Sequence, residues 1–318
     1  MKPRLVVIAG PTAVGKTRLA VELAKRIDGE IISADSMQVY KHMDIGTAKP
    51  TAEEMGGIPH YLIDEVEPWE EYSAAIFAQK AKLYLERIYA RGKAAIIAGG
   101  TGFYVNALVY DNDFGTADAD AGIRAELYAY AQIHGALALH DMLRQADPCS
   151  AERIHPNNVK RVVRAIEFHR LFGESISRHN DLERGRVSPY DAEFFILFMP
   201  REKLYRRIEQ RVDNMVRDGL VGEVQKLLDM GVSPDAVSMR GQGYKEIVPY
   251  LQGRAALEEC VQTLKRNTRR FAKRQITWFK HQSVKPSAEN SVTEKWIDVD
   301  EDVKLCIIED IIRMVRKV

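Results

Sequence analysis

The stretch that decides the fold is "LVVIAGPTAVGKT", residues 5–17. Residues 5–9 form a continuous apolar run, which is typical of a parallel strand buried on both faces. Residues 10–17 then match the pattern G-x-x-x-x-G-K-T, and an apolar residue recurs every fourth position from Leu19 to Ile27. A strand, a glycine-rich loop and a helix in this order predict a loop that binds phosphate.

The predicted loop has a defined chemistry. Its backbone N–H groups converge on an anion, and the following helix adds the positive end of its dipole. We expect Lys16 to neutralise the terminal phosphate and the Thr17 hydroxyl to hold Mg²⁺, the cofactor that this motif suggests. The pattern predicts a polyphosphate ligand without identifying it. The residues predicted to bind the phosphates are Gly10, Pro11, Thr12, Ala13, Val14, Gly15, Lys16 and Thr17.

Three more apolar runs predict further strands, and helical periodicity separates them. They cover residues 30–34, 94–100 and 194–199. Strands that alternate with helices predict an α/β fold, here a parallel sheet of the P-loop NTPase type flanked by helices.

The middle of the chain follows a different pattern. Residues 113–190 show helical periods and no convincing strand. We expect an all-helical insertion into the α/β core, with extra helices packed on the same sheet as the alternative. We therefore divide the chain into a first part of the core at 1–112, the insertion at 113–190, and the remainder of the core at 191–318.

The composition sets outer bounds. The 318 residues are 46% hydrophobic and carry a formal net charge of +1. Cys149, Cys260 and Cys306 are far apart in the sequence, which argues against a disulfide framework or a thiolate metal site. No apolar run reaches the roughly eighteen residues of a membrane helix. We expect a cytoplasmic protein that binds no membrane, has no structural zinc and is a monomer.

Two residues follow predicted strands at the edge where α/β proteins bind ligands. Asp35 comes after the second strand, where a carboxylate could act as a general base toward an acceptor, or could cap a turn. Thr101 follows the third strand in "GGTGFY", where its hydroxyl could bond an acceptor or a phosphate oxygen, or belong to a simple turn. The third strand ends in Gly99 and Gly100 instead of the carboxylate usual in nucleotide hydrolases. This favours a kinase, or a transferase that binds pyrophosphate, over an ATPase motor.

Basic residues gather in the segment 265–280. Between Glu259 and Glu289 no acidic residue accompanies them, and an uncompensated basic surface suits a phosphate backbone. Pairing with acidic residues elsewhere in the fold is the alternative. The two rows of the expected helix are Lys265, Arg269 and Lys273, and Arg266, Arg270 and Arg274.

Two smaller basic sets lie elsewhere. Lys160, Arg161 and Arg164 project from an expected helix opposite its apolar residues. Arg207 and Arg211 are one helical turn apart, a spacing found where arginines cover bound phosphates and equally on a plain surface helix.

Taken together, these segments resemble one family closely, the tRNA dimethylallyltransferases, also called tRNA isopentenyltransferases. The resemblance covers nearly the whole chain in order. Its most specific parts are "DSMQVY" followed by "GTAKP", and "TRRFAKRQITWF"; "HPNNVKRVVRAIE" and "RGQGYKEI" also match. No zinc-finger extension of the kind found in eukaryotic relatives is recognised, which favours the bacterial type. The segment "DNDFGTADADAGIR" lacks the proline-rich turn expected before the insertion.

The resemblance implies an activity. Such enzymes move a dimethylallyl group from dimethylallyl diphosphate to the exocyclic amine of the adenine immediately 3′ of the anticodon, in tRNAs that read codons starting with U. Asp35 matches the family's base, and Thr101 matches a residue near the amine or the diphosphate. Lys16, Mg²⁺ near Thr17, and arginines such as Arg207 and Arg211 would stabilise the departing diphosphate. The adenine must leave its stack to react.

The resemblance and the basic rows together predict the contacts with the anticodon stem-loop of tRNA, which the insertion would grip. The predicted tRNA-binding residues are Asp35, Ser36, Met37, Gln38, Thr101, Ile123, Lys160, Arg161, Val162, Val163, Arg164, Arg240, Gly241, Gln242, Gly243, Tyr244, Lys245, Lys265, Arg266, Arg269, Arg270, Lys273 and Arg274.

Three alternatives share some of these features. A P-loop kinase of a nucleoside or small metabolite would use the loop and Asp35 but not the basic helix. An isopentenyltransferase that acts on free adenine nucleotides would need neither the basic helix nor the insertion. A non-catalytic RNA-binding protein would not need Asp35.

Overall fold

The computed structural model describes residues 2–112, 120–184, 186–282, 291–299, 308–309 and 311–313. The chain forms two compact units, which we describe separately. The core unit comprises Met1–Asp111 and Ser188–Val318, and the insertion unit comprises Asn112–Val187. Half of the segment "DNDFGTADADAGIR", namely residues 113–119, lies outside the described residues.

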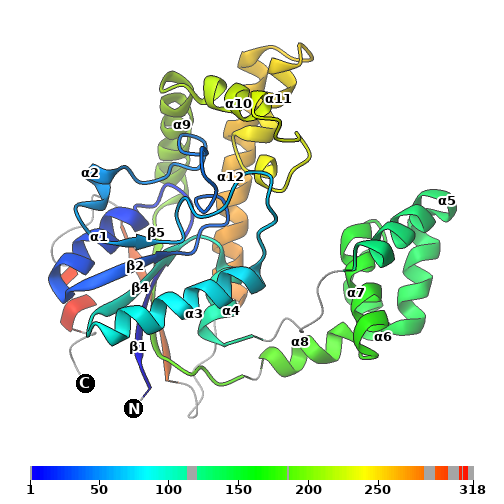
Figure 1. Cartoon of the computed structure of the whole chain (residues 1–318), viewed down its shortest axis with the longest axis horizontal. Coiled ribbons are helices and arrows are strands. Elements are labelled where there is room, and N and C mark those ends of the chain that lie inside the picture. Colours follow the sequence, from blue (N-terminus) through cyan, green and yellow to red (C-terminus); the bar gives the residue numbers. More distant parts are fainter. Residues whose placement is uncertain are drawn as a thin grey trace. The chain divides into compact units, whose positions relative to one another are not determined.

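The core unit is built on a parallel sheet with the strand order β3-β2-β4-β1-β5-β6 (Figure 1). The α/β fold with a parallel sheet is therefore confirmed. The strands are β1 Arg4–Ala9, β2 Gly29–Ser33, β3 His60–Tyr61, β4 Ala94–Gly99, β5 Asp191–Phe198 and β6 Val292–Asp298.

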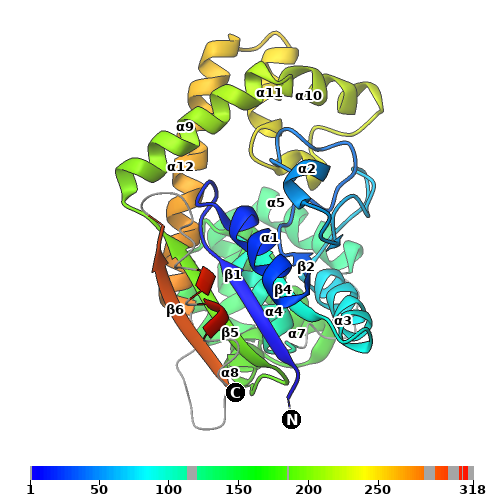
Figure 2. The ribbon, with the colours of Figure 1, turned by 90° about the vertical axis from the view of Figure 1, so that its left-hand side faces the viewer.

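The central strands are apolar because both of their faces are covered. Helix α1 covers one face of the sheet, and α4 lies against the other (Figure 2). Leu19 and Leu23 of α1 pack on Ile8 of β1 and Phe195 of β5 in one buried cluster. The helices of the core unit are α1 Lys16–Ile27, α2 Ala52–Met55, α3 Ala74–Ala90, α4 Gly102–Val109, α9 Arg201–Arg217, α10 Leu220–Asp229, α11 Tyr244–Leu251 and α12 Leu257–Gln282, with a 3-10 turn η1 at Ser238–Arg240.

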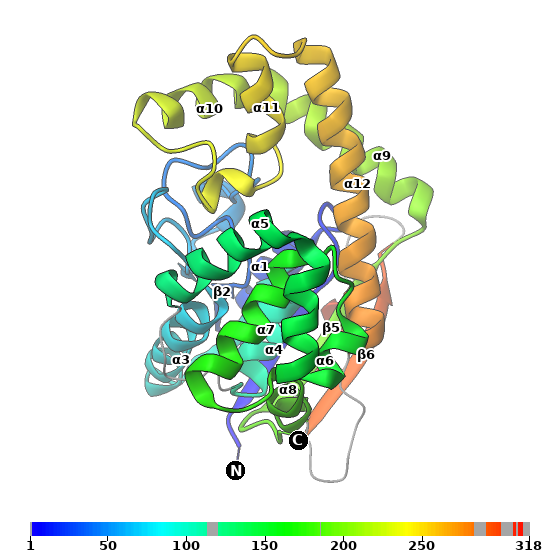
Figure 3. The same ribbon diagram turned by 90° about the vertical axis from the view of Figure 1, so that its right-hand side faces the viewer.

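Helix α12 is the longest continuous element of the core unit and lies beside α9 in both side views (Figures 2 and 3). Its buried row includes Leu264, Thr268, Ala272, Gln275 and Phe279. The row reaches from α11 to the sheet. Helix α12 therefore connects α11 with the carboxyl ends of the strands.

The insertion unit contains only helices among its described residues. Val162, Val163 and Ile166 of α7 pack on Leu127 and Leu139 of α5. Helix α5 is broken at Gly135, which has a φ of 87°. The helices are α5 Ala121–Ala146, α6 Pro148–Arg153, α7 Val159–Phe172 and α8 Ile176–Arg184.

A buried carboxylate fixes the end of α5 to its neighbours. Asp147 accepts hydrogen bonds from the hydroxyls of Ser150 at 2.7 Å and Ser177 at 2.6 Å. Burial would raise the pKa of Asp147, but the bonds from Ser177 and Ser150 outweigh it and lower that pKa. Asp147 thus joins α6 and α8 inside this unit.

Nowhere in the described part of the chain is a helix both long enough and apolar enough to cross a membrane.

Candidate active site and RNA-binding surface

The loop between β1 and α1 has the backbone of a phosphate cradle. Gly10 has a φ of 143°, and a Cβ atom there would lie 2.6 Å from the carbonyl oxygen of Leu197. Gly15 has a φ of 104° and precedes the first turn of α1. Among the described residues no side chain caps this helix. Its first N–H groups are therefore available to an anion.

Lys16 lies half-buried at the centre of the cradle. Its Nζ donates a 2.8 Å hydrogen bond to the carbonyl of Pro11. Burial lowers the pKa of Lys16 to about 8; the Asp35 carboxylate acts against this shift and the Arg211 guanidinium adds to it. The lysine predicted to bind phosphate, the predicted base and one predicted arginine are therefore within electrostatic reach of one another.

Arg211 of α9 approaches the loop. Its Nη1 lies 3.5 Å from Thr12 Oγ1, at the limit of a hydrogen bond. Burial and the neighbouring Arg207 lower the pKa of Arg211, while Glu54 and Asp35 act in the opposite direction. Arg211 is thus not on a plain surface helix, although Arg207 is exposed.

Asp35 begins a turn at the carboxyl end of β2. One carboxylate oxygen accepts the N–H of Met37 at 2.9 Å, so the residue does cap a turn. The other oxygen has no hydrogen-bond partner among the described residues. Thr101, after β4, accepts the N–H of Ser36 through Oγ1 at 3.3 Å. The ends of the two strands are joined here, with one carboxylate oxygen left for a ligand.

Gln38 is held by the protein itself. Its Nε2 donates to the carbonyls of Thr47 at 3.4 Å and Ala48 at 3.3 Å. Its Oε1 accepts the hydroxyl of Ser33 at 3.0 Å. In this arrangement Gln38 positions the residues around it, and its contact with an acceptor stays a prediction.

Gln275 of α12 is a site residue that the sequence analysis missed. Its Oε1 accepts the N–H of Thr12 at 2.9 Å, and its Nε2 donates to the carbonyl of Gly100 at 3.0 Å. The side chain is buried and connects α12 to both the cradle and the end of β4. The available signal was a polar residue in the largely apolar row of a basic helix.

The segment 240–245 lies beside the turn that contains Asp35. A Cβ atom on Gly241 would lie 2.9 Å from the sulfur of Met37. Tyr244 is fully buried, while Arg240 and Lys245 are exposed. The side-chain oxygen of Gln242 is buried and lacks a hydrogen-bond partner among the described residues. A buried acceptor of this kind is open to a partner such as an ordered water or a ligand.

The insertion unit corrects part of the predicted tRNA contacts. The side chains of Val162 and Val163 are buried in its core and are closed to RNA, because they pack against α5. Arg164 pairs with the buried Glu167 at 3.0 Å. Lys160 and Arg161 are exposed, and Ile123 is partly buried against the unit's core.

Helix α12 corrects the prediction that both basic rows lack acidic partners. Lys265 pairs with Asp213 at 2.6 Å and Arg269 pairs with Glu209 at 2.5 Å, both acids being on α9. Most of the first row therefore lies in the contact between α12 and α9. The second row is exposed and has no acidic partner among the described residues; it comprises Arg266, Arg270 and Arg274.

The fold and this site define a P-loop protein whose predicted phosphate-binding loop lies within electrostatic reach of the Asp35 carboxylate. The sequence model of the family described as IPP transferase matches residues 38–282. The chain belongs to the IPP transferase family, and its resemblance to the tRNA dimethylallyltransferases is confirmed.

Individual relatives agree over almost the whole chain. The tRNA dimethylallyltransferase of Lachnoclostridium phytofermentans is 56% identical over 282 residues, covering 89% of this chain and 90% of its own. The structure of the full-length tRNA isopentenylpyrophosphate transferase from Bacillus halodurans matches with a TM-score of 0.73 and 46% identity, covering 99% of this chain and 96% of its own. A eukaryotic dimethylallyltransferase described as acting on tRNA matches with a TM-score of 0.84 and 28% identity, covering 99% and 80%.

Proposed function

We propose that this enzyme transfers the dimethylallyl group of dimethylallyl diphosphate to the exocyclic amine of an adenine in tRNA. The carbon–oxygen bond to the diphosphate breaks, a carbon–nitrogen bond forms, and the amine loses one proton. The observation that carries this proposal is that the Asp35 carboxylate lies close enough to Lys16 to act on the pKa of that lysine. It supports a single site with a phosphate cradle and a base.

The cradle serves a leaving group in this proposal. Lys16, Arg211 and the N–H groups at the start of α1 would stabilise the negative charge that develops on the departing diphosphate. The Thr17 hydroxyl forms no hydrogen bond with the described residues, so it fits a ligand of Mg²⁺. When bound, Mg²⁺ would neutralise diphosphate charge; it commonly takes few protein ligands beside phosphate oxygens.

Asp35 and Thr101 serve the acceptor. The lone pair of the adenine amine is delocalised into the ring, which makes the amine a poor nucleophile. The free carboxylate oxygen of Asp35 would take the proton as the new bond forms, and the Thr101 hydroxyl would orient the amine or a phosphate oxygen. The adenine must leave its stack to reach this edge of the sheet, as base-modifying enzymes require.

The finer identity of the substrate follows from the family. We assign the modified adenine to the position immediately 3′ of the anticodon, in tRNAs that read codons starting with U. The exposed row of α12, the segment 240–245, and Lys160 and Arg161 of the insertion unit would contact the anticodon stem-loop, because exposed cations bind its phosphates. We propose that the enzyme acts as a monomer. We also place the enzyme in the cytoplasm, together with its tRNA substrate.

The test offers purified enzyme two donors and two acceptors. Dimethylallyl diphosphate with a tRNA transcript should add one dimethylallyl unit to one adenine of the anticodon loop, detected by mass spectrometry of nuclease fragments. ATP as donor, or AMP as acceptor, should give no product. Phosphorylation from ATP would establish the kinase alternative, and prenylation of AMP in preference to tRNA would establish the free-nucleotide alternative.

A further inference from the structure

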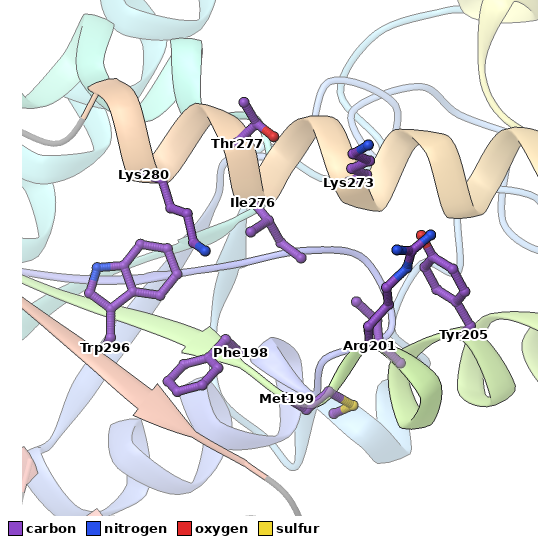
Figure 4. A pocket seen from close by; sticks show the side chains of 10 residues that line it. Phe198, Met199, Arg201, Tyr205, Lys273, Ile276, Thr277, Lys280 and Trp296 are labelled. Carbon is purple, nitrogen blue, oxygen red and sulfur yellow. The ribbon is translucent and has the colours of Figure 1, made fainter.

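The core unit contains a cavity whose lining is separate from the loop 10–17. It has a volume of about 550 Å³, within the range of small-ligand sites, and lies between the end of β5, the first turns of α9, α12 and β6 (Figure 4). No residue of the loop 10–17 lines it, and neither Asp35 nor Thr101 does. The cavity is thus distinct from the site proposed for the reaction.

The cavity is lined by cations without acids. Arg201, Lys273 and Lys280 line it, and no Asp or Glu is among its lining residues. None of these three cations forms an ion pair with the described residues. Higher on the same helix, Lys265 and Arg269 are neutralised by α9. Near the cavity, the lysines of α12 therefore have no acidic partner among the described residues. Such cations could bind a phosphate group.

The opposite wall is aromatic and apolar. Phe198 and Trp296 meet edge to face with ring centroids 6.0 Å apart. Trp296 is held in place by a 2.6 Å hydrogen bond from Nε1 to Glu294. Figure 4 shows Lys280 extending from α12 past the Trp296 ring, with Ile276 beside it. A ligand that matches both walls combines a flat apolar ring with a phosphate, which is the chemistry of a nucleotide.

The surroundings of the cavity point to a nucleotide within a chain. Lys273 is adjacent to Arg274, the last residue of the exposed basic row, and no acidic residue occurs between 260 and 282. Basic tracks that lead to aromatic platforms are how proteins bind single-stranded nucleic acid. We propose that the cavity holds one unpaired nucleotide of the tRNA, with its base against Trp296 and its phosphate between Lys273 and Lys280. This inference rests on the proposed function, because it takes tRNA as the substrate.

The first test removes the two lysine charges. The double variant Lys273→Gln/Lys280→Gln changes exposed side chains, so the fold is retained. The Kd for tRNA should rise at least tenfold, and the slope of log K against log salt should shrink by about 0.7–0.9 for each lost phosphate contact. The KM for dimethylallyl diphosphate should stay unchanged. The control is Lys25→Gln, an exposed lysine of α1, which should alter none of these values.

The second test locates the nucleotide directly. Ultraviolet cross-linking of tRNA to the enzyme, followed by peptide mapping, should join RNA to the peptide of Trp296 or Phe198, and AMP at the same nucleotide concentration should cross-link far less. Normal tRNA prenylation with no cross-link at this wall and an unchanged Kd in the double variant would overturn the inference and leave the proposed function intact. Cross-linking by AMP that tRNA does not displace would also overturn it. A cross-link at Trp296 without any prenylation would support the binding site and count against the proposed reaction.

Discussion

The hydroxyl of Tyr244 donates a 2.7 Å hydrogen bond to the carboxylate of Glu223. The same carboxylate accepts the backbone N–H groups of residues 44–46 at 2.8, 2.8 and 2.9 Å. Burial, followed by the nearby Glu223 carboxylate, raises the pKa of Tyr244 well above its ordinary value, so it stays a donor. The carboxylate of Glu223, on α10, therefore binds both the loop 44–46, which follows β2, and Tyr244, the first residue of α11.

The loop that Glu223 binds is connected to the candidate site by Gln38. The carbonyls of Thr47 and Ala48, directly after the held residues, accept the side-chain amide of Gln38. Gln38 itself lies in the turn that follows Asp35. Glu223 thus positions the acceptor side of the site without lining it.

The first prediction concerns Glu223→Gln. The amide keeps the shape but loses the charge and half of the acceptor capacity, so some of the N–H groups of residues 44–46 lose their partner. We expect the free energy of unfolding in urea to fall by about 1–3 kcal/mol and the KM for tRNA to rise more than kcat falls. Tyr244→Phe is the matched control, since it removes one donor and leaves the loop bonds; it should cost about 1 kcal/mol. Equal stability of Glu223→Gln and the wild type would contradict this role.

The second prediction concerns the proposed base. Asp35→Asn keeps an oxygen that can accept the N–H of Met37, so the turn should persist. It removes the proton acceptor, and the single-turnover rate should fall by about 10²–10⁴. The Kd for tRNA should change little. A variant that prenylates tRNA at the wild-type rate would exclude Asp35 as the base.

The third prediction follows from the pKa of Lys16, which burial lowers to about 8 in the protein without ligand. Lys16 is therefore mostly charged at pH 7 and loses its charge as the pH rises through 8. We expect the affinity for inorganic diphosphate with Mg²⁺, measured by calorimetry, to fall by up to about tenfold per pH unit above 8. A lysine with an ordinary pKa would hold its charge to about pH 10.

Raising the pH has opposite effects on stability and on the affinity for diphosphate. Between about pH 8 and 10.5 the unfolded chain keeps the proton on Lys16 and the folded chain does not, so this group's contribution to stability rises with pH. Lys16→Met is the control for both measurements, because it should bind diphosphate weakly at every pH. A wild-type affinity that stays level from pH 7 to 9.5 would show that Lys16 keeps its proton.

The sequence was sufficient for the parts of the fold that repeat a local pattern. The loop 10–17 and the four strands β1, β2, β4 and β5 follow from apolar runs and glycine spacing, because a strand covered on both faces has few polar positions. The two strands it did not predict lack that pattern. β3 has only two residues, and β6, "VTEKWID", carries charges on the exposed edge of the sheet.

The site was harder to predict where residues distant in sequence meet. Nothing local to Gln275 shows that it bonds to Thr12 and Gly100, since that depends on where α12 crosses the sheet. The acids that neutralise Lys265 and Arg269 are equally invisible in the helix's own sequence. Their spacing of four on α9 becomes meaningful only when the two helices lie side by side.

The fourth prediction separates the two basic rows of α12. The double variant Arg270→Gln/Arg274→Gln removes exposed cations without acidic partners, so it should weaken tRNA binding and reduce the salt slope by about 0.7–0.9 for each lost phosphate contact. Lys265→Gln is the matched control, because that lysine is already neutralised by Asp213. It should leave the salt slope unchanged and lower stability by at most about 1 kcal/mol. Kd measurements at several salt concentrations decide the matter: equal slopes for both variants would mean that the exposed row does not contact phosphates.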